Sequence, residues 1–93
     1  MYALSFDMSF VDLQEHYGDP YNGAYYDIKR TLVEEGFYWI QGSTYLTDSD
    51  NLTNLFKAIE ALKKIDWFRK SVRDIRGYRV EEWSDFTDIV KED

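Results

Sequence analysis

The stretch Tyr-Ala-Leu-Ser-Phe-Asp at residues 2–7 decides how the rest of the chain folds. Large apolar side chains such as Leu4 and Phe6 alternate there with the small or polar Ser5 and Asp7. Successive side chains of a β-strand point to opposite faces, so this alternation predicts a strand with one apolar and one polar face. The apolar face must pack against other elements, and Asp7 lies at the carboxyl end of the polar face.

Two helices are expected after this strand. Ser9 begins the pattern Ser-x-x-Asp, in which the serine side chain caps the first amides of a helix, and the apolar residues that follow have helical spacing. Gly18 is expected to end this short helix. Asp19 and Pro20 then have the order of a cap followed by a proline at the first helical position. They predict a longer helix that starts there and ends at Gly36.

A β-hairpin is expected next. Residues 37–40 are apolar at every position, which predicts a strand that is covered on both faces. The residues Gln41, Gly42 and Ser43 favour a tight turn. Residues 44–47 are rich in side chains that favour strands, so they are expected to form the returning strand.

The second half of the chain predicts one more amphipathic helix and one more strand. Apolar residues have helical spacing in the segment 52–62, and Asp50 or Ser49 is expected to cap this helix. Residues 72–80 alternate imperfectly and are expected to form the last strand. Residues 81–93 are an acidic tail in which the pattern indicates no element.

The order strand, helix, strand, strand, helix, strand is the βαββαβ arrangement of ferredoxin-like sandwiches. We therefore predict an α+β fold with a four-stranded antiparallel sheet and an extra short helix after the first strand. Residues 1–93 are expected to form a single domain. In this topology the first strand lies between the third and the fourth and runs antiparallel to both. Asp7, Ser43 and the segment 69–73 are then expected to converge.

Composition excludes several classes of protein. The 93 residues include one proline and no cysteine, and 18% of them are aromatic. Disordered, collagen-like and disulfide-stapled chains have other compositions, and zinc fingers and cysteine nucleophiles require cysteine. The formal net charge of −7 argues against a general nucleic-acid coat protein, so any role with nucleic acid must depend on local charge.

Charge is distributed unevenly along the chain. Residues 1–28 contain acids but no lysine or arginine, whereas residues 69–79 contain five basic residues and the single acid Asp74. The amino terminus has no basic segment and reaches an acid at Asp7, unlike a signal peptide. No apolar run approaches the ~18 residues of a membrane span. We therefore expect a cytoplasmic protein that does not act at a membrane.

Four stretches of the sequence carry a resemblance to one known family: residues 1–7 (MYALSFD), 41–45 (QGSTY), 66–76 (DWFRKSVRDIR) and 83–91 (WSDFTDIVK). Together they span nearly the whole chain, which resembles the bacterial virulence-associated protein D family. Members of that family are small cytosolic dimers with a modified ferredoxin-like fold. They are related in shape to the small CRISPR-associated nuclease subunit of spacer acquisition. They are described as endoribonucleases, and some act as toxins of toxin–antitoxin pairs.

The resemblance implies an endoribonuclease that acts on RNA as a homodimer, with an antitoxin protein as a further partner. It also implies that Asp7 is the catalytic acid and that the turn at Gly42 and Ser43 lies beside it. A helix capped at Ser9 would place amide donors near Asp7 as well.

Cleavage of RNA requires more than one carboxylate. Either a base must take the proton of the 2′-hydroxyl or a metal ion must activate a water, and positive charge must stabilise the phosphorane that develops. Asp7 alone is therefore an incomplete site. A two-fold axis could bring two copies of Asp7 together, and such a pair could hold Mg²⁺ or Mn²⁺. The alternative is that Asp7 only ends its strand in solvent.

The other candidate residues each have a structural alternative. Ser43 can donate a hydrogen bond to a phosphate oxygen or can satisfy the backbone of its turn. Arg69, Lys70 and Arg73 can bind the RNA backbone or can pair with acids of the same chain. His16 is the only histidine and has no orienting partner nearby in the sequence, so we interpret it as a surface residue of the short helix.

Two functional hypotheses of different classes follow. The first is a homodimeric endoribonuclease with Asp7 as metal ligand or general base. The apolar segment 37–40 supports a dimer, because two helices can cover only one face of a four-stranded sheet and something else must cover the other. The second is a non-catalytic interaction module whose acidic surface engages a basic protein.

Overall fold

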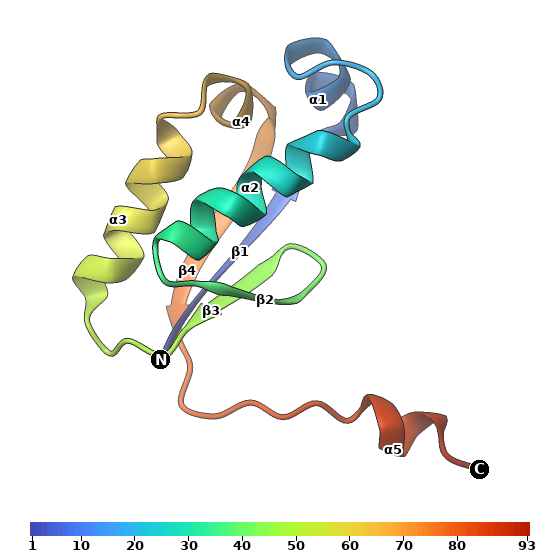
Figure 1. Ribbon diagram of the computed structural model, residues 1–93, viewed down its shortest axis with the longest axis vertical. Helices are drawn as coiled ribbons and strands as arrows, with labels where there is room; N and C mark the ends of the chain where they lie inside the picture. The colour runs from blue at the N-terminus through green and yellow to red at the C-terminus, as the bar shows by residue number, and fades with distance from the viewer.

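Four strands form one antiparallel sheet in the order β2-β3-β1-β4, and helices pack on one of its faces (Figure 1). The computed structural model describes residues 1–93. In chain order the elements are β1 (Tyr2–Met8), α1 (Phe10–His16), α2 (Asn22–Glu34), β2 (Tyr38–Gln41), β3 (Thr44–Thr47), α3 (Leu52–Lys63), α4 (Asp66–Ser71), β4 (Val72–Arg79) and α5 (Thr87–Lys91). This is the predicted ferredoxin-like α+β sandwich, and α1 is the extra short helix after the first strand.

The strand β1 lies inside the sheet between β3 and β4, as predicted. It pairs antiparallel with β3, where Ser5 lies opposite Thr44, and with β4, where Asp7 lies opposite Asp74. Hydrogen bonds along both edges fix the face to which each side chain of β1 points. The sheet therefore keeps the division between apolar and polar faces that the alternation predicts.

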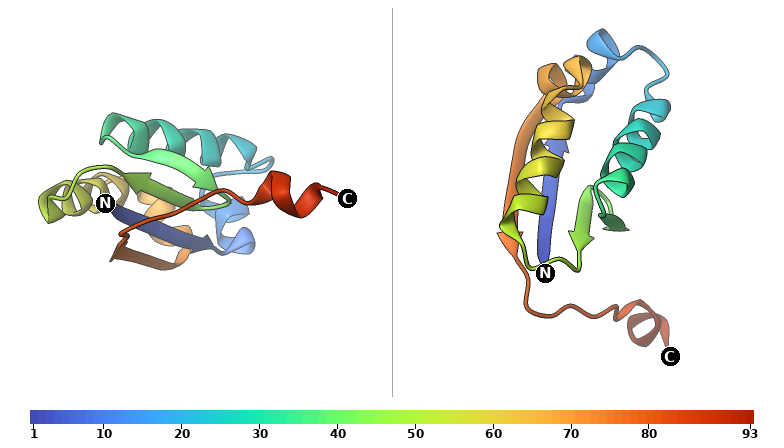
Figure 2. Two further views of the ribbon diagram at one scale, coloured as in Figure 1. Left: turned by 90° about the horizontal axis from the view of Figure 1, so that it is seen from below. Right: turned by 60° about the vertical axis from the view of Figure 1, so that its left-hand side comes forward.

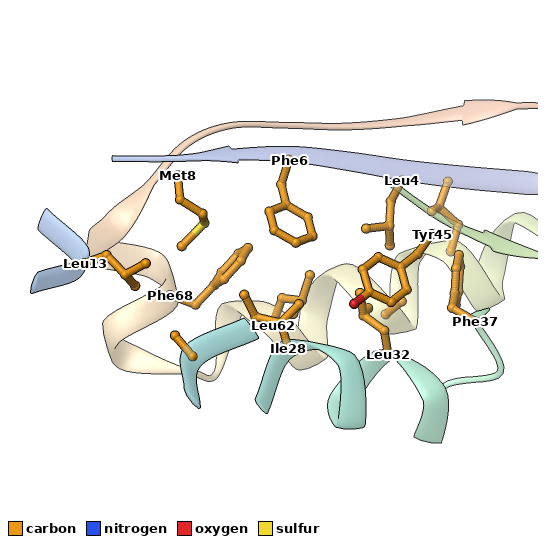
Figure 3. Packing of buried hydrophobic residues seen from close by; sticks show 13 residues of the cluster. Leu4, Phe6, Met8, Leu13, Ile28, Leu32, Phe37, Tyr45, Leu62 and Phe68 are labelled. Carbon is orange, nitrogen blue, oxygen red and sulfur yellow. The ribbon is translucent and has the colours of Figure 1, made fainter. Parts of the chain in front are cut away.

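The apolar face of β1 packs against α2, α3 and α4 to form the core. Figure 3 shows Leu4, Phe6 and Met8 pointing from β1 toward the helices. The ring of Phe6 meets Phe68 edge to face, with 5.7 Å between ring centroids, and stacks on Tyr45 at 6.3 Å. The opposite side of the sheet carries no helical layer (Figure 2), and we call it the open face.

The start of α1 and the ends of α1 and α2 are confirmed. The Ser9 hydroxyl caps α1 by accepting a hydrogen bond from the Asp12 amide at 3.3 Å. Gly18 follows α1 with a φ of 126°, and Gly36 follows α2 with a φ of 84°. Residues with a Cβ rarely adopt these values, so glycine is suited to both chain reversals.

The predicted start of α2 at Asp19 and Pro20 is wrong. The helix begins at Asn22, and the residue before it, Tyr21, makes no side-chain cap. Tyr21 instead stacks on Phe10 of α1, with 5.7 Å between ring centroids. Packing between aromatic side chains at this point outweighs the local preference of proline for the first helical position.

The prediction that residues 37–40 are covered on both faces is also wrong for the single chain. Phe37 is buried, but it precedes the strand. Within β2, Tyr38 is 36% exposed and Trp39 is 51% exposed. The reason is topological, because β2 is the outermost strand of the sheet and the helices do not extend over it on both sides.

The cap of α3 differs from the prediction by one residue. Asn51, rather than Ser49 or Asp50, accepts a hydrogen bond from the Thr53 amide at 2.9 Å. Asp50 instead accepts a hydrogen bond from the amino terminus of Met1 at 2.6 Å, and this bond holds the pKa of its carboxyl below the ordinary value. The start of α3 is thereby tied to the start of β1.

Residues 81–93 form an arm that leaves the end of β4 and carries α5 (Figures 1 and 2). We call it the C-terminal arm. Every residue of the arm is exposed, including Trp83 and Phe86, and its six acids outnumber its one lysine. None of the helices of the protein is long and apolar enough to cross a membrane.

Replacement of Leu4 by alanine is expected to destabilise the protein strongly. The Leu4 side chain is fully buried at the centre of the sheet, and deletion of a buried leucine side chain lowers the free energy of unfolding by about 2–5 kcal/mol. Urea denaturation followed by circular dichroism measures the loss. Val11→Ala, at a side chain that is 73% exposed, is the control and should change the free energy by less than about 0.5 kcal/mol. A loss below about 1 kcal/mol for Leu4→Ala would contradict the position of this side chain.

Candidate active site

Asp7 projects from the open face of the sheet. It lies between Phe6 and Met8, both of which are buried on the helical side, so the alternation of β1 forces its side chain to the other side. The Asp7 side chain is 68% exposed and makes no hydrogen bond within the chain. The carboxylate is therefore accessible to a substrate from solvent.

A second carboxylate lies beside Asp7 on the neighbouring strand. Asp74 of β4 is the direct cross-strand partner of Asp7. Side chains in such positions have Cβ atoms roughly 4.5–5.5 Å apart, and like charges there destabilise the sheet. Two like charges on neighbouring strands are tolerated when cations lie close to both of them. In the sequence, Asp74 is recognisable only as the single acid of a basic segment.

An arginine accompanies each of the two carboxylates. The Nε of Arg73 lies 3.9 Å from the Oδ2 of Asp7, close enough for an ion pair. The Nε of Arg76 lies 3.0 Å from Oδ2 and 3.3 Å from Oδ1 of Asp74. Both arginine side chains are mostly exposed, so their charges face solvent as well as their partners. The site thus combines two negative and two positive groups on one exposed surface.

A bulge in β4 explains how Arg73 reaches Asp7. Asp7 pairs with Asp74, whereas the next residue, Met8, pairs with Val72, so Arg73 is an extra residue in β4. An extra residue bends its strand and redirects the side chains around it, and such bulges occur often beside active sites. The backbone carbonyl of Ser71 accepts a hydrogen bond from the Ser9 amide at 2.8 Å, which ties this end of β4 to the end of β1.

The carboxylates border a shallow hollow of about 320 Å³ on the open face. Its lining consists of Ser5, Phe6, Asp7, Asp74, Arg76 and Tyr78. The Ser5 hydroxyl lies 2.7 Å from the Tyr78 hydroxyl and 3.0 Å from the hydroxyl of Thr44. A row of three hydroxyl groups therefore crosses three strands beside the carboxylates. The three residues are far apart in the sequence, and only the order and the register of the strands bring their hydroxyl groups together.

The turn that contains Ser43 lies beside the end of β1, as expected. The carbonyl oxygen of Ser43 accepts a hydrogen bond from the amide of Phe6 at 3.1 Å, so the backbone of the turn is held next to Asp7. Gly42 supports this tight turn with a φ of 47°. The half-buried side chain of Ser43 makes no hydrogen bond within the chain, which leaves its hydroxyl free to donate.

Arg69 and Lys70 do not contact Asp7. Both pair with Asp66 on the same helix, Arg69 at 2.5 Å and Lys70 at 3.0 Å. The hydrogen bond from Lys70 is the main reason why the pKa of the Asp66 carboxyl lies below its ordinary value. All three side chains are exposed, so these ion pairs are open to solvent.

The amide donors of α1 do not serve Asp7. The Ser9 hydroxyl accepts a hydrogen bond from the Asp12 amide, whereas Asp7 forms no hydrogen bond to the helix. The expectation that amides of α1 donate to the Asp7 carboxylate is therefore wrong. The reason is spatial, because Asp7 points away from the helical layer. His16 is exposed near Glu15, with Nε2 4.0 Å from the carboxylate oxygen, in agreement with a surface position.

Two places have the donor chemistry for a divalent cation. Asp7 and Asp74 offer carboxylate oxygens, which are the ligands that Mg²⁺ and Mn²⁺ prefer, although each carboxylate also lies near an arginine. The side chains of Asp12, Glu15 and His16 on α1 have ligand atoms within 4.8 Å of one another. Only the first place adjoins the hollow on the open face.

Comparison with known proteins agrees with the resemblance seen in the sequence, although no family model matches the chain. The chain is 56% identical over 91 residues to the protein named Endoribonuclease VapD of Dichelobacter nodosus, and 98% of each chain is covered. It is 52% identical over 93 residues to Endoribonuclease VapD of Helicobacter pylori, covering 98% of this chain and 99% of that one. Against the Haemophilus influenzae protein of the same name the identity is 43% over 91 residues, with 98% and 99% covered. Because the identity is high and extends over nearly the full length, the chain belongs to the VapD endoribonuclease family.

Proposed function

We propose that this protein cleaves RNA phosphodiester bonds on the open face of its sheet, with Asp7 as the central catalytic group. The observation that carries the proposal is the convergence of Asp7, Arg73 and the pair Asp74 and Arg76 on one exposed surface. The near full-length similarity to proteins named Endoribonuclease VapD supports RNA as the substrate.

The groups on the open face suit two forms of the reaction. In the first, the Asp7 carboxylate takes the proton of the 2′-hydroxyl while the 2′-oxygen attacks the adjacent phosphorus, and the Arg73 guanidinium stabilises the charge of the phosphorane. The bond from phosphorus to the 5′-oxygen then breaks, the 5′-oxygen takes a proton from water, and a 2′,3′-cyclic phosphate remains. In the second, Asp7 would hold Mg²⁺ or Mn²⁺ together with Asp74 or with the Asp7 of a second copy, and the bound ion would provide an activated water as the nucleophile. Ser43 can donate to a phosphate oxygen in either form.

The proposal includes binding of the RNA backbone along the segment 69–73. Arg73 already lies at the carboxylates, whereas Arg69 and Lys70 are held by Asp66 on α4. A phosphate that displaces Asp66 would gain both cations at once. Arg73 therefore acts at the reacting phosphate, and the other two bind a neighbouring part of the backbone.

The proposal also includes a homodimer that acts in the cytoplasm. The open face lacks a helical layer, and large apolar side chains of the C-terminal arm such as Trp83 and Phe86 are exposed. A monomer of this size rarely exposes so much apolar surface without a partner. The family resemblance supports a further step, in which the protein is the toxin of a toxin–antitoxin pair with an antitoxin protein as partner.

Asp7→Asn is expected to abolish RNA cleavage, with a loss of about 10²–10⁴-fold, because the amide can neither accept a proton nor hold a metal ion. Glu34→Gln, at an exposed acid on the helical layer, is the matched control and should keep full activity. Cleavage of a labelled RNA is measured together with the molar mass in solution, which should be that of a dimer for all three proteins. Full cleavage by Asp7→Asn would remove Asp7 from the mechanism. Absence of any cleavage by the wild type would favour the non-catalytic interaction module.

The ends of the RNA products are expected to distinguish the two forms of the reaction. A 5′-phosphate end together with loss of activity in a chelator indicates a metal-activated water, whereas a 2′,3′-cyclic phosphate indicates attack by the neighbouring hydroxyl. Mass spectrometry of the products, with and without chelator, measures both. Cyclic phosphate products that form equally well in the chelator would exclude a role for Mg²⁺ or Mn²⁺ in the reaction.

Arg73→Gln is expected to lower kcat by about 10- to 100-fold, because it removes the positive charge that faces the developing phosphorane. Arg69→Gln is the matched comparison on α4, and we expect it to raise KM by about 2- to 5-fold with kcat nearly unchanged, since an exposed cation that binds the RNA backbone in competition with Asp66 contributes little. Steady-state kinetics on one RNA substrate separate the two effects. Equal losses of kcat in both variants would contradict the assignment of Arg73 to the reacting phosphate.

A further inference from the structure

Basic side chains gather where α3 meets α4. Residues 63–73 contain five basic residues and the single acid Asp66, in a chain whose formal net charge is −7. Lys63 is the last residue of α3, and Lys64 follows it as the C-cap. The exposed cations of α4 come next in the chain. We use the name Asp66 cluster for this acid and the four basic residues nearest to it in the sequence, which are Lys63, Lys64, Arg69 and Lys70.

Helical spacing brings the charged ends of two of these cations to Asp66. Arg69 and Lys70 lie three and four residues after Asp66, so the three side chains share one side of α4. The Nη2 of Arg69 lies 2.5 Å from Oδ1 of the carboxylate, and the Nζ of Lys70 lies 3.0 Å from Oδ2. Lys63 and Lys64 are exposed within three residues of Asp66 and form no ion pair within the chain. Four positive groups therefore lie near a single carboxylate.

The Asp66 cluster lies on the other side of the sheet from Asp7. Figure 3 shows Phe68 of α4 against Phe6 on the helical side, whereas Asp7 projects from the open face. The six residues of α4 make a helix about 9 Å long, and Arg73 is the second residue of the strand that follows it. Arg73 therefore lies between the reaction centre and the cluster. A second copy that covers the open face leaves the helical side, and with it the cluster, accessible to RNA.

A phosphate of RNA offers these cations the same kind of partner as the Asp66 carboxylate. Its oxygens accept charge-assisted hydrogen bonds from arginine and lysine. Exposed ion pairs contribute little to stability, so the exchange of Asp66 for a phosphate costs little. A free anion must compete with Asp66 from dilute solution, whereas a phosphate of a strand that is already held at Arg73 has a high effective concentration. The cluster is therefore suited to a phosphate that arrives as part of a longer strand.

We propose that the Asp66 cluster is a second phosphate-binding site for the RNA backbone, apart from the reacting phosphate, and that Asp66 closes this site to free anions. The inference rests on the proposed function and adds the substrate class. The substrate is an RNA strand long enough to pass from Asp7 around the end of the sheet to α4. Lys63 and Lys64 are then RNA-binding residues, and Asp66 sets the selectivity for long strands.

Asp66→Asn should tighten the binding of RNA by about 3- to 10-fold, because it removes the acid that competes with the phosphate. The probe is a labelled 2′-O-methyl oligoribonucleotide of about 20 nucleotides in EDTA, longer than a typical single-strand site and cleaved by neither form of the reaction. Fluorescence anisotropy gives Kd. Asp27→Asn is the matched control, since Asp27 pairs with Arg30 on α2 at the same spacing and at 2.7 Å, and it should change Kd by less than about 1.5-fold. Equal tightening by both variants would overturn the role of Asp66.

Lys63→Gln combined with Lys64→Gln should weaken the binding of the same RNA by about 3- to 10-fold. The slope of log Kd against log salt concentration should fall by about 0.7 for each phosphate contact that is lost. Lys29→Gln combined with Arg30→Gln removes another exposed basic pair, on α2, and should leave the slope unchanged. Basic residues also stabilise the end of a helix, so circular dichroism and thermal denaturation check that both double variants are folded. An unchanged slope without Lys63 and Lys64 would overturn the second site.

Cleavage of RNAs of two lengths separates the second site from the reaction centre. A dinucleotide contains only the reacting phosphate, so Asp66→Asn should change its kcat/KM by less than about 2-fold, whereas kcat/KM for a long RNA should rise by about 3- to 10-fold. An equal rise for both substrates would overturn the inference, because Asp66 would then act at the reacting phosphate. If Asp7→Asn cleaves like the wild type, or if no RNA is cleaved, the proposed function fails, while the binding measurements still decide whether the Asp66 cluster holds RNA.

Discussion

The pairing of β1 on both of its edges is the constraint on which the rest of the structure depends. Hydrogen bonds to β3 and to β4 fix the orientation of every side chain on this strand. Leu4 and Phe6 then join the core, and Asp7 can only project from the open face. A shift of the strand by one residue would bury the carboxylate and expose the core. The stability of the fold and the placement of the candidate site therefore have one origin.

The open face carries chemistry that a purely structural surface would avoid. Like charges directly opposite one another on neighbouring strands lower stability, and Asp7 faces Asp74 in this way. Arg73 and Arg76 offset part of this repulsion, and a bulge in β4 brings the first of them to Asp7. Because these groups are exposed, the net contribution of the ion pairs to stability is small. The arrangement is better explained by the binding of a phosphate than by the stability of the sheet.

The charges of the whole chain also weaken unspecific binding of RNA. An acidic protein repels the backbone of RNA, and its basic residues at positions 69–76 each lie near an acid of the same chain. A phosphate must compete with those acids for the basic side chains, so binding of RNA through charge alone is weak. Contacts with the RNA bases would then supply the affinity that charge alone does not.

The amino-acid sequence alone predicts the fold class, the order of the strands, the hairpin turn and the position of Asp7 at the end of the first strand. Each of these follows from the alternation of apolar and polar residues, from the positions of glycines, and from the rules by which strands and helices are connected. These signals depend on residues that are close together in the sequence. Three facts come from the three-dimensional structure alone: Asp74 faces Asp7, Asp66 pairs with Arg69, and Tyr38 and Trp39 are exposed on an edge strand. Those facts depend on register, a bulge and the extent of the helical layer, which arise from contacts between residues far apart in the chain.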